Sequence, residues 1–213
     1  MAYAVGLMAT DGCLINTGRH LSFDSGDADL VETFLRCIGR PVRYRKVRTR
    51  SGGVVYKAQF GDVVWYRWLE SIGLHQRKSL TLGAIDVPDE HLLSLARGLL
   101  DGDGSVLSFS HHPTRKTYPT YEYRRLWTLF HSASRAHLEW LRSRLHRCLG
   151  IKGLIDMRRK AGRHDMFRLK YGNLESKVLL TRLYEDPTSP RLMRKWKKWD
   201  DFRERKLCAD GGT

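Results

Sequence analysis

The sequence predicts an α+β protein built as a tandem αββαββα repeat, in which two antiparallel sheets are joined through a pair of helices. Two nine-residue segments are near copies, AVGLMATDG at residues 4–12 and ARGLLDGDG at residues 96–104, and each is an apolar helical run that ends in Asp-Gly. Two later helical segments also end alike, in RCIG at residues 36–39 and in RCLG at residues 147–150. A returning strand in each half alternates apolar and polar residues, which is typical of a half-buried strand.

The elements follow one order in both halves. After each Asp-Gly come a β-like stretch and a helix, and Gly39 and Gly150 fit the left-handed residue that closes many helices. A basic hairpin then turns at residues 51–53 and at residues 161–163, before a further helix. Pro88, followed by two acids, suits a new helix N-terminus. We expect closing helices at 63–73 and 174–184, halves at 1–80 and 88–206, a linker at 81–87 and a flexible tail at 207–213.

Small residues recur every four positions in the two repeated segments. The ridges are Ala2, Gly6 and Thr10, and Ser94, Gly98 and Gly102. A glycine inside a helix costs about 1 kcal/mol relative to alanine, so Gly6 and Gly98 are explained if two helix backbones pack closely there. Packed in parallel, these helices would bring Asp11 and Asp103 together at one end.

Two acids at paired helix ends predict a metal site. The C-terminal end of a helix already bears partial negative charge and favours cations over carboxylates by roughly 0.3 to 1 kcal/mol. A divalent cation would relieve the repulsion between Asp11 and Asp103, and hard oxygen ligands with open positions suit Mg²⁺. A calcium loop is excluded, because Val106 stands where such a loop needs glycine and His112 where it needs the terminal glutamate.

The composition points to a polyanionic partner. The chain has 213 residues with 38 Lys and Arg against 23 Asp and Glu, a formal charge of +15. No run of about 18 apolar residues predicts a membrane span, so nucleic acid is favoured over a membrane surface. The four cysteines form no C-x-x-C pair and are expected to be reduced, mostly buried and structural. Without the pattern of a secretory signal, we expect an intracellular protein of the cytoplasm, nucleoid or an organelle matrix.

These motifs resemble the LAGLIDADG homing endonucleases in their single-chain form, over nearly the whole chain. The resemblance implies a monomer whose halves each present a saddle-shaped sheet to the major groove of DNA. Asp11 and Asp103 match the metal-binding acid of the motif, and the backbone carbonyls of Thr10 and Gly102 would help to bind the metal. It further implies cleavage of both strands of a long pseudo-symmetric target, leaving short 3′ overhangs. Mg²⁺ would serve as cofactor, with Mn²⁺ substituting and Ca²⁺ supporting binding without cleavage.

The resemblance also indicates further site residues. Ala9 replaces the acid that the second motif keeps as Asp101, a position that is not the essential ligand. Lys78 and Lys195, at the ends of the two halves, are similar in place to the family's basic active-site residue, and Arg194 is an alternative to Lys195. Two polar residues at matching strand positions lie near where the family places a residue beside the active site: Gln59 and Lys170.

Sequence reading is expected from the strands, because Arg, Lys, Gln and Asn side chains can recognise base edges in the major groove. Basic residues at positions 43–50 fall on both alternation phases, so they cannot all face one groove. The candidates are Asn16, Arg19, Arg43, Arg45, Arg48, Lys57, Arg115, Lys116, Arg158 and Arg168. Two alternatives share the scaffold: an RNA-binding intron maturase, and a sequence-specific DNA-binding protein without catalysis.

Overall fold

A computed structural model describes the chain except for residues 42, 50–51, 112–122, 160–163 and 211–213. The first half contains α1 (Ala2–Thr10), β1 (Gly12–Leu14), β2 (His20–Ser25), α2 (Ala28–Ile38), β3 (Tyr44–Arg48), β4 (Val54–Gly61) and α3 (Val63–Ser71). The second half contains α4 (Leu92–Asp101), β5 (Ser105–His111), β6 (Tyr123–Ser132), α5 (Arg135–Leu149), β7 (Leu154–Arg158), β8 (Met166–Tyr171) and α6 (Asn173–Leu183). The predicted αββαββα order is therefore confirmed twice.

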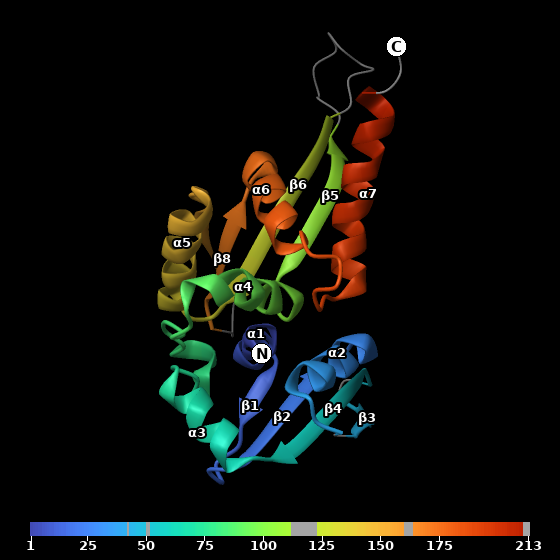
Figure 1. Cartoon of the computed structure of the whole chain (residues 1–213). Helices are drawn as coiled ribbons and strands as arrows, with labels where there is room; N and C mark the ends of the chain where they lie inside the picture. Colours follow the sequence, from blue (N-terminus) through green and yellow to red (C-terminus); the bar gives the residue numbers. More distant parts are fainter. Residues whose placement is uncertain (42, 50–51, 112–122, 160–163, 211–213) are drawn as a thin grey trace.

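The two sheets have the same antiparallel topology. Their strand orders are β1-β2-β4-β3 and β5-β6-β8-β7. The halves lie end to end, with α1 and α4 between the sheets (Figure 1). A last helix, α7 (Met193–Asp210), lies along β5 and follows the repeat. Its backbone stays helical past residue 207, where the sequence predicts a flexible tail.

The helix pair is as closely packed as the small-residue ridges predict. A Cβ built on Gly6 would lie 2.4 Å from the carbonyl oxygen of Leu95, and one built on Gly98 would lie 2.2 Å from that of Tyr3. A Cβ on Gly102 would lie 2.0 Å from the Thr10 hydroxyl. Because the contacts advance in the same direction along both helices, α1 and α4 run in parallel.

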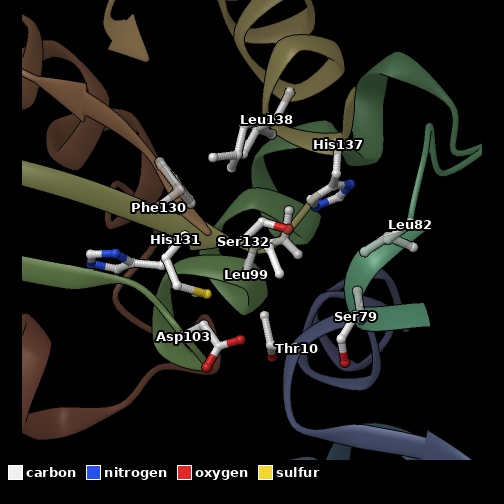
Figure 2. A pocket seen from close by; sticks show the side chains of 14 residues that line it. Thr10, Ser79, Leu82, Leu99, Asp103, Phe130, His131, Ser132, His137 and Leu138 are labelled. Atoms are coloured by element: carbon white, nitrogen blue, oxygen red, sulfur yellow. The ribbon is translucent and has the colours of Figure 1, made fainter. Parts of the chain in front are cut away.

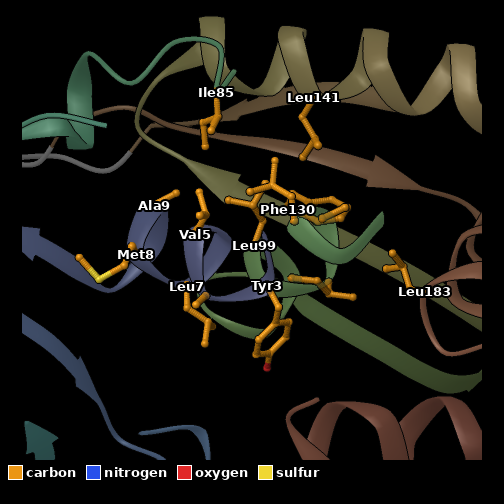
Figure 3. Close-up of a cluster of buried hydrophobic side chains, with 14 of the residues drawn as sticks. Tyr3, Val5, Leu7, Met8, Ala9, Ile85, Leu99, Phe130, Leu141 and Leu183 are labelled. Carbon is orange, nitrogen blue, oxygen red and sulfur yellow. The ribbon is translucent and has the colours of Figure 1, made fainter. Parts of the chain in front are cut away.

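A continuous core surrounds this helix pair. Val5 and Leu7 of α1 and Leu99 of α4 are buried together with Phe130 of β6 and Leu141 of α5 (Figure 3). Apolar burial of this extent is the main stabilising contribution to the fold. Both halves therefore share one core, which fixes the positions of the two motif ends.

Each sheet has a buried face and an open face. Ala58 of β4 and Leu169 of β8 are fully buried, whereas their neighbours Gln59 and Lys170 point to the other side. This alternation is the one the sequence predicts for the returning strands. The open faces carry the polar and basic side chains that are candidates for contact with nucleic acid.

Helix ends follow the predicted signals. Gly39 closes α2 with φ 63° and Gly150 closes α5 with φ 70°, both in the left-handed region that glycine tolerates best. Asp62 caps the N-terminus of α3 through the backbone N–H of Trp65, at 3.0 Å. These caps satisfy backbone groups that a helix leaves unpaired.

The expectation of mostly buried cysteines is wrong. Cys13 and Cys148 are exposed and Cys37 is half-buried against the core; all three are free thiols. Cys148 lies near the end of α5, on turns that face solvent. The side chain of Cys208 lies outside the described residues. Within the described part of the chain, no helix has the length and apolar character needed to cross a membrane.

Candidate active site

The paired helices bring the two predicted acids to one place. Asp11 is the residue that closes α1, and Asp103 follows the end of α4 by two residues. The contact between Gly102 and Thr10 shows that the two helix ends meet. Asp11 is half-buried, whereas Asp103 reaches the surface. The geometry thus forms one acidic centre from both halves of the chain.

The electrostatics of this centre are unfavourable for two carboxylates. Burial, and then the negative charge of Asp103, raise the pKa of Asp11 to about 7. The surrounding protein also raises the pKa of Asp103 by desolvation, although Lys195, His131 and Lys78 oppose that shift. A raised carboxyl pKa means that the charged form lacks stabilisation. The pair therefore favours an added cation.

Lys195 is positioned by the end of α4. The residue is 3% exposed, and its ammonium donates to the carbonyl oxygens of Leu100 at 2.7 Å, Asp101 at 2.7 Å and Gly102 at 2.9 Å. These bonds use its three N–H donors. Burial lowers the pKa of Lys195 to about 8. Lys195 therefore neutralises the negative helix end beside Asp103, and it contacts the Gly102 carbonyl that the family resemblance assigns to metal binding.

Lys78 occupies the corresponding place in the first half. The residue is 6% exposed, and its ammonium donates to the carbonyl oxygen of Gly12, directly after Asp11. Burial lowers its pKa, and the negative charges of the nearby acids oppose that shift. Arg77, just before it, has a left-handed backbone with φ 53°, a conformation that costs strain in a non-glycine residue. That strain is located where the chain turns Lys78 inward.

Arg194 does not take the place of Lys195. Its guanidinium is instead bidentate to Asp27, with N–O distances of 2.7 to 3.0 Å. Asp27 precedes α2 in the first half, so this ion pair connects α7 to the opposite half. Of the two neighbouring cations, Lys195 is the one at the acidic centre.

Two residues at the centre were missed in the sequence analysis. Asp24, near the end of β2, raises the pKa of Asp11 through its charge. His131, near the end of β6, lowers the pKa of Asp103 through its charge. The sheet registers make them equivalent, since Asp24 pairs with Lys57 and His131 pairs with Arg168. One Asp24 oxygen, Oδ1, is buried without a hydrogen-bond partner among the described residues. The two halves of the centre therefore differ chemically.

Gln59 lies two residues after Lys57 on β4, and Lys170 lies two residues after Arg168 on β8. Gln59 pairs with Ser22 and is exposed, and Lys170 pairs with Leu129. The Lys170 ammonium sits 3.3 Å from the centre of the Trp127 ring, a cation–π contact. Within the described part of the structure, neither side chain contacts the acid pair. Asp24 and His131 occupy the strand positions nearest to it.

A cavity of about 220 Å³ lies beside the centre, between the end of α1 and the second half. Thr10, Asp103 and His131 line one side and His137 lines another (Figure 2). Ser79 and Leu82 bring the connection between the halves to the same cavity. Asp103 therefore lines a space that is large enough to hold water.

Most of the predicted DNA-binding residues that the structure describes lie on the open faces or at their edges, but the prediction for Arg48 is wrong because strand alternation turns it to the opposite face. The register puts Arg45 on the face of Lys57, whereas Arg48 shares the opposite face with Tyr44. Asn16 and Arg19 are exposed in the β1–β2 turn, at the outer end of the first half (Figure 1). Arg43 precedes β3, Arg158 ends β7 and Arg168 lies on β8. Arg115 and Lys116 lie outside the described residues.

The acid pair fits a divalent cation. Its donors are hard carboxylate oxygens, which such ions prefer, and the raised pKa of Asp11 reports unrelieved negative charge. In the described ranges, no cluster of three or more His, Cys, Asp and Glu side chains forms a closed ligand set. A cation held by Asp11 and Asp103 would therefore keep positions for water and phosphate.

Comparison with solved structures identifies the architecture. No family model and no curated protein sequence matches the chain. Meganuclease I-SmaMI bound to uncleavable DNA aligns over 99% of this chain and 91% of its own, with a TM-score of 0.66 and 13% identity. The chain has the fold of the single-chain LAGLIDADG homing endonucleases. The LAGLIDADG enzyme I-LtrWI bound to target DNA aligns over 95% of this chain and 87% of its own, with a TM-score of 0.59 and 11% identity. I-DmoI in complex with DNA and Ca aligns over 87% and 88%, with a TM-score of 0.53 and 14% identity.

Proposed function

We propose that this LAGLIDADG-fold protein is a site-specific DNA endonuclease that cuts both strands of a long pseudo-symmetric target with Mg²⁺. The observation that carries this proposal is the single acidic centre formed by Asp11 and Asp103 at the meeting point of two basic sheets. One chain supplies both acids, so the enzyme acts as a monomer. The same fold in structures of homing endonucleases bound to DNA supports the assignment.

Asp11 and Asp103 would hold the divalent cation, with the carbonyls of Thr10 and Gly102 as further oxygen donors. When bound, Mg²⁺ supplies charge stabilisation at the phosphate and lowers the pKa of water. Mn²⁺ substitutes for Mg²⁺, and Ca²⁺ supports binding without cleavage. The I-DmoI complex with DNA and Ca is consistent with a divalent ion in this fold.

The two lysines perform different tasks in the hydrolysis. Lys195 is committed to three backbone carbonyls and offsets the negative end of α4. Lys78 bonds to one carbonyl among the described residues, so it retains N–H groups that can contact a phosphate oxygen. Extra negative charge on the phosphate in the transition state is stabilised by such a preorganised donor. His131 and Asp24 orient water on their respective sides.

The open sheet faces bind the DNA. Arg45, Lys57, Arg158 and Arg168 lie on these faces or at their ends, and the net charge of +15 supports association with a polyanion. Each half contacts one half of the target in the major groove. Cleavage across the minor groove between the halves leaves short 3′ overhangs. The family resemblance associates this activity with intron homing.

The test is cleavage of a large randomised duplex library by the purified full-length protein. Parallel reactions contain Mg²⁺, Ca²⁺ or a chelator, and the ends are sequenced. We expect ends at one sequence, in Mg²⁺ only, with a short 3′ stagger. Enrichment of one sequence by binding, with no ends in Mg²⁺, would instead indicate a DNA-binding protein without catalysis. Tighter binding to structured intron RNA than to any duplex would indicate a maturase.

A further inference from the structure

Equivalent cross-strand rows on the two open faces carry different charged side chains, and their acids stand on different strands. The rows cross the sheets beside the acidic centre, at the level of Asp24 in one half and of His131 in the other. From the inner strand outward they are Asp24, Lys57 and Arg45 in the first half, and His131, Arg168 and Asp156 in the second. The acid therefore lies on β2 in the first row and on the outer strand β7 in the second. The middle residue of the row is a lysine in the first half and an arginine in the second.

The second row contains a rigid ion pair. Arg168 donates through Nε to Asp156 Oδ1 at 2.7 Å and through Nη2 to Oδ2 at 2.5 Å. The two side chains are 17% and 32% exposed. Arg168 lowers the pKa of Asp156, which stays ionised at neutral pH. A bidentate pair of this kind fixes the plane of the guanidinium as well as its position.

The ion pair leaves three N–H donors of the Arg168 guanidinium available for a ligand. An arginine has five N–H donors, and the bonds to Asp156 use the Nε donor and one donor on Nη2. The remaining Nη2 donor and the two on Nη1 have no acceptor among the described residues. A pair of parallel donors matches the O6 and N7 acceptors of guanine, the commonest specific arginine contact in the major groove.

Lys57, the counterpart of Arg168, cannot read a base in the same way. Its ammonium forms one ion pair, with Asp24 Oδ2 at 3.1 Å. A lysine is a point charge on a flexible stem, whereas a guanidinium has a fixed planar fork. The two halves therefore differ in how strongly they can select one base at these equivalent positions.

We propose that Asp156 is a positioning residue that holds Arg168 to read one guanine in the half-site bound by the second sheet. This inference rests on the proposed function and adds a base preference to it. The guanine lies in the inner part of that half-site, because Arg168 pairs across the strands with His131, which lines the cavity beside Asp103. The half-site bound by the first sheet has no matching requirement.

The experiment is selection of bound duplexes from a randomised library by the full-length protein, in Ca²⁺ without Mg²⁺. The variants are Arg168→Lys, which keeps the charge, and Asp156→Asn, which frees the guanidinium. Asp165→Asn is the matched control, because it makes the same charge change at an exposed position on the same hairpin. Affinity for an unrelated duplex is measured for all four proteins.

We expect one guanine position to lose about tenfold in discrimination in both Arg168→Lys and Asp156→Asn, while the other positions keep theirs. Asp156→Asn should bind unrelated DNA as tightly as the wild type or more tightly, because it loses a negative charge facing DNA. A purely structural role for the pair would instead weaken all binding together. Asp165→Asn should keep the wild-type base preferences.

The two proposals fail in distinguishable ways. If the wild type selects a defined site but Asp156→Asn keeps every base preference, the inference about Arg168 is wrong and the proposed function stands. The same conclusion follows if the position lost in Arg168→Lys is not a guanine. If the wild type selects no site at all, both the proposed function and this inference are contradicted.

Discussion

Asp101 accepts a hydrogen bond from the backbone N–H of Leu192, at 2.8 Å, and so ties the end of α4 to the start of α7. The same carboxylate accepts from the Tyr3 hydroxyl at 2.8 Å. Three residues after Leu192, Lys195 reaches back to the last carbonyls of α4. Asp101 is fully buried and so cannot serve as an accessible ligand beside Asp103. Its position instead determines where Lys195 lies.

Replacing Asp101 with alanine, the residue that the first motif has at Ala9, should impair both folding and cleavage. The Tyr3 hydroxyl and the Leu192 N–H would be buried without their acceptor, at about 1 to 3 kcal/mol each. We expect the free energy of unfolding to fall by about 3 kcal/mol, measured by urea denaturation, and kcat to fall more than KM rises. Asp101→Asn, which keeps one acceptor oxygen, should lose less of both. Equal stability of wild type and Asp101→Ala would contradict this role.

Asp11→Asn should stabilise the protein when no divalent ion is present. The pKa of Asp11 is raised from 3.8 to about 7 in the folded chain, so the wild type loses stability as pH rises from about 4 to 7 and a charged carboxylate becomes buried. At pH 8 in chelator, the variant should be more stable by about 1 to 2 kcal/mol. Near pH 4 the difference should vanish. Urea denaturation at both values checks this, and a less stable variant at pH 8 would rule the account out.

Gly98→Ala should separate the helix pair. Its added Cβ would meet the Tyr3 carbonyl oxygen at 2.2 Å and the Gly6 Cα at 3.0 Å, both backbone atoms that cannot move independently. Overpacking of this kind costs about 1 to 3 kcal/mol, and the acids would no longer meet correctly. Gly172→Ala is the control, because an added Cβ there meets nothing within 4 Å. Thermal unfolding should show a lower midpoint for Gly98→Ala alone.

DNA affinity should fall steeply with salt. Basic residues on the open sheet faces would neutralise phosphates, and each phosphate contact releases counterions on binding. With six or more such contacts, affinity should drop about 10³-fold or more between roughly 50 and 200 mM salt. Fluorescence anisotropy with a labelled duplex measures this dependence. A flat titration would exclude the sheet faces as the binding surface.

The repeat made the fold predictable from the sequence. The Asp-Gly motifs fixed the two halves, and the small residues at Gly6 and Gly98 indicated a close helix pair that the structure confirms. The family resemblance indicated Lys78 and Lys195 at the ends of the halves, and both lie at the acidic centre. The repeat and the helix pair could be predicted because they depend on local spacing, which a sequence displays directly.

The remaining parts of the centre depend on strand register. Asp24 and His131 are equivalent in the sheets, but they follow their motifs at different distances, because β5, β6 and the segment between them contain more residues than β1, β2 and the segment between those. No sequence periodicity relates them. The choice between Lys195 and Arg194 likewise depends on Asp27, far away in the chain, which binds Arg194. Contacts between segments that are far apart in the sequence therefore determine which of these residues lie at the acidic centre.

The most direct test of the acidic centre is cleavage of a supercoiled plasmid that carries the selected target, by wild type, Asp11→Asn and Asp103→Asn. Circular dichroism and target binding in Ca²⁺ establish that each variant folds and engages DNA. The account predicts that wild type linearises the plasmid only with a divalent ion, and that neither variant produces linear DNA. Linearisation by either folded variant at the wild-type rate would contradict the assignment of Asp11 and Asp103 as the metal-binding pair.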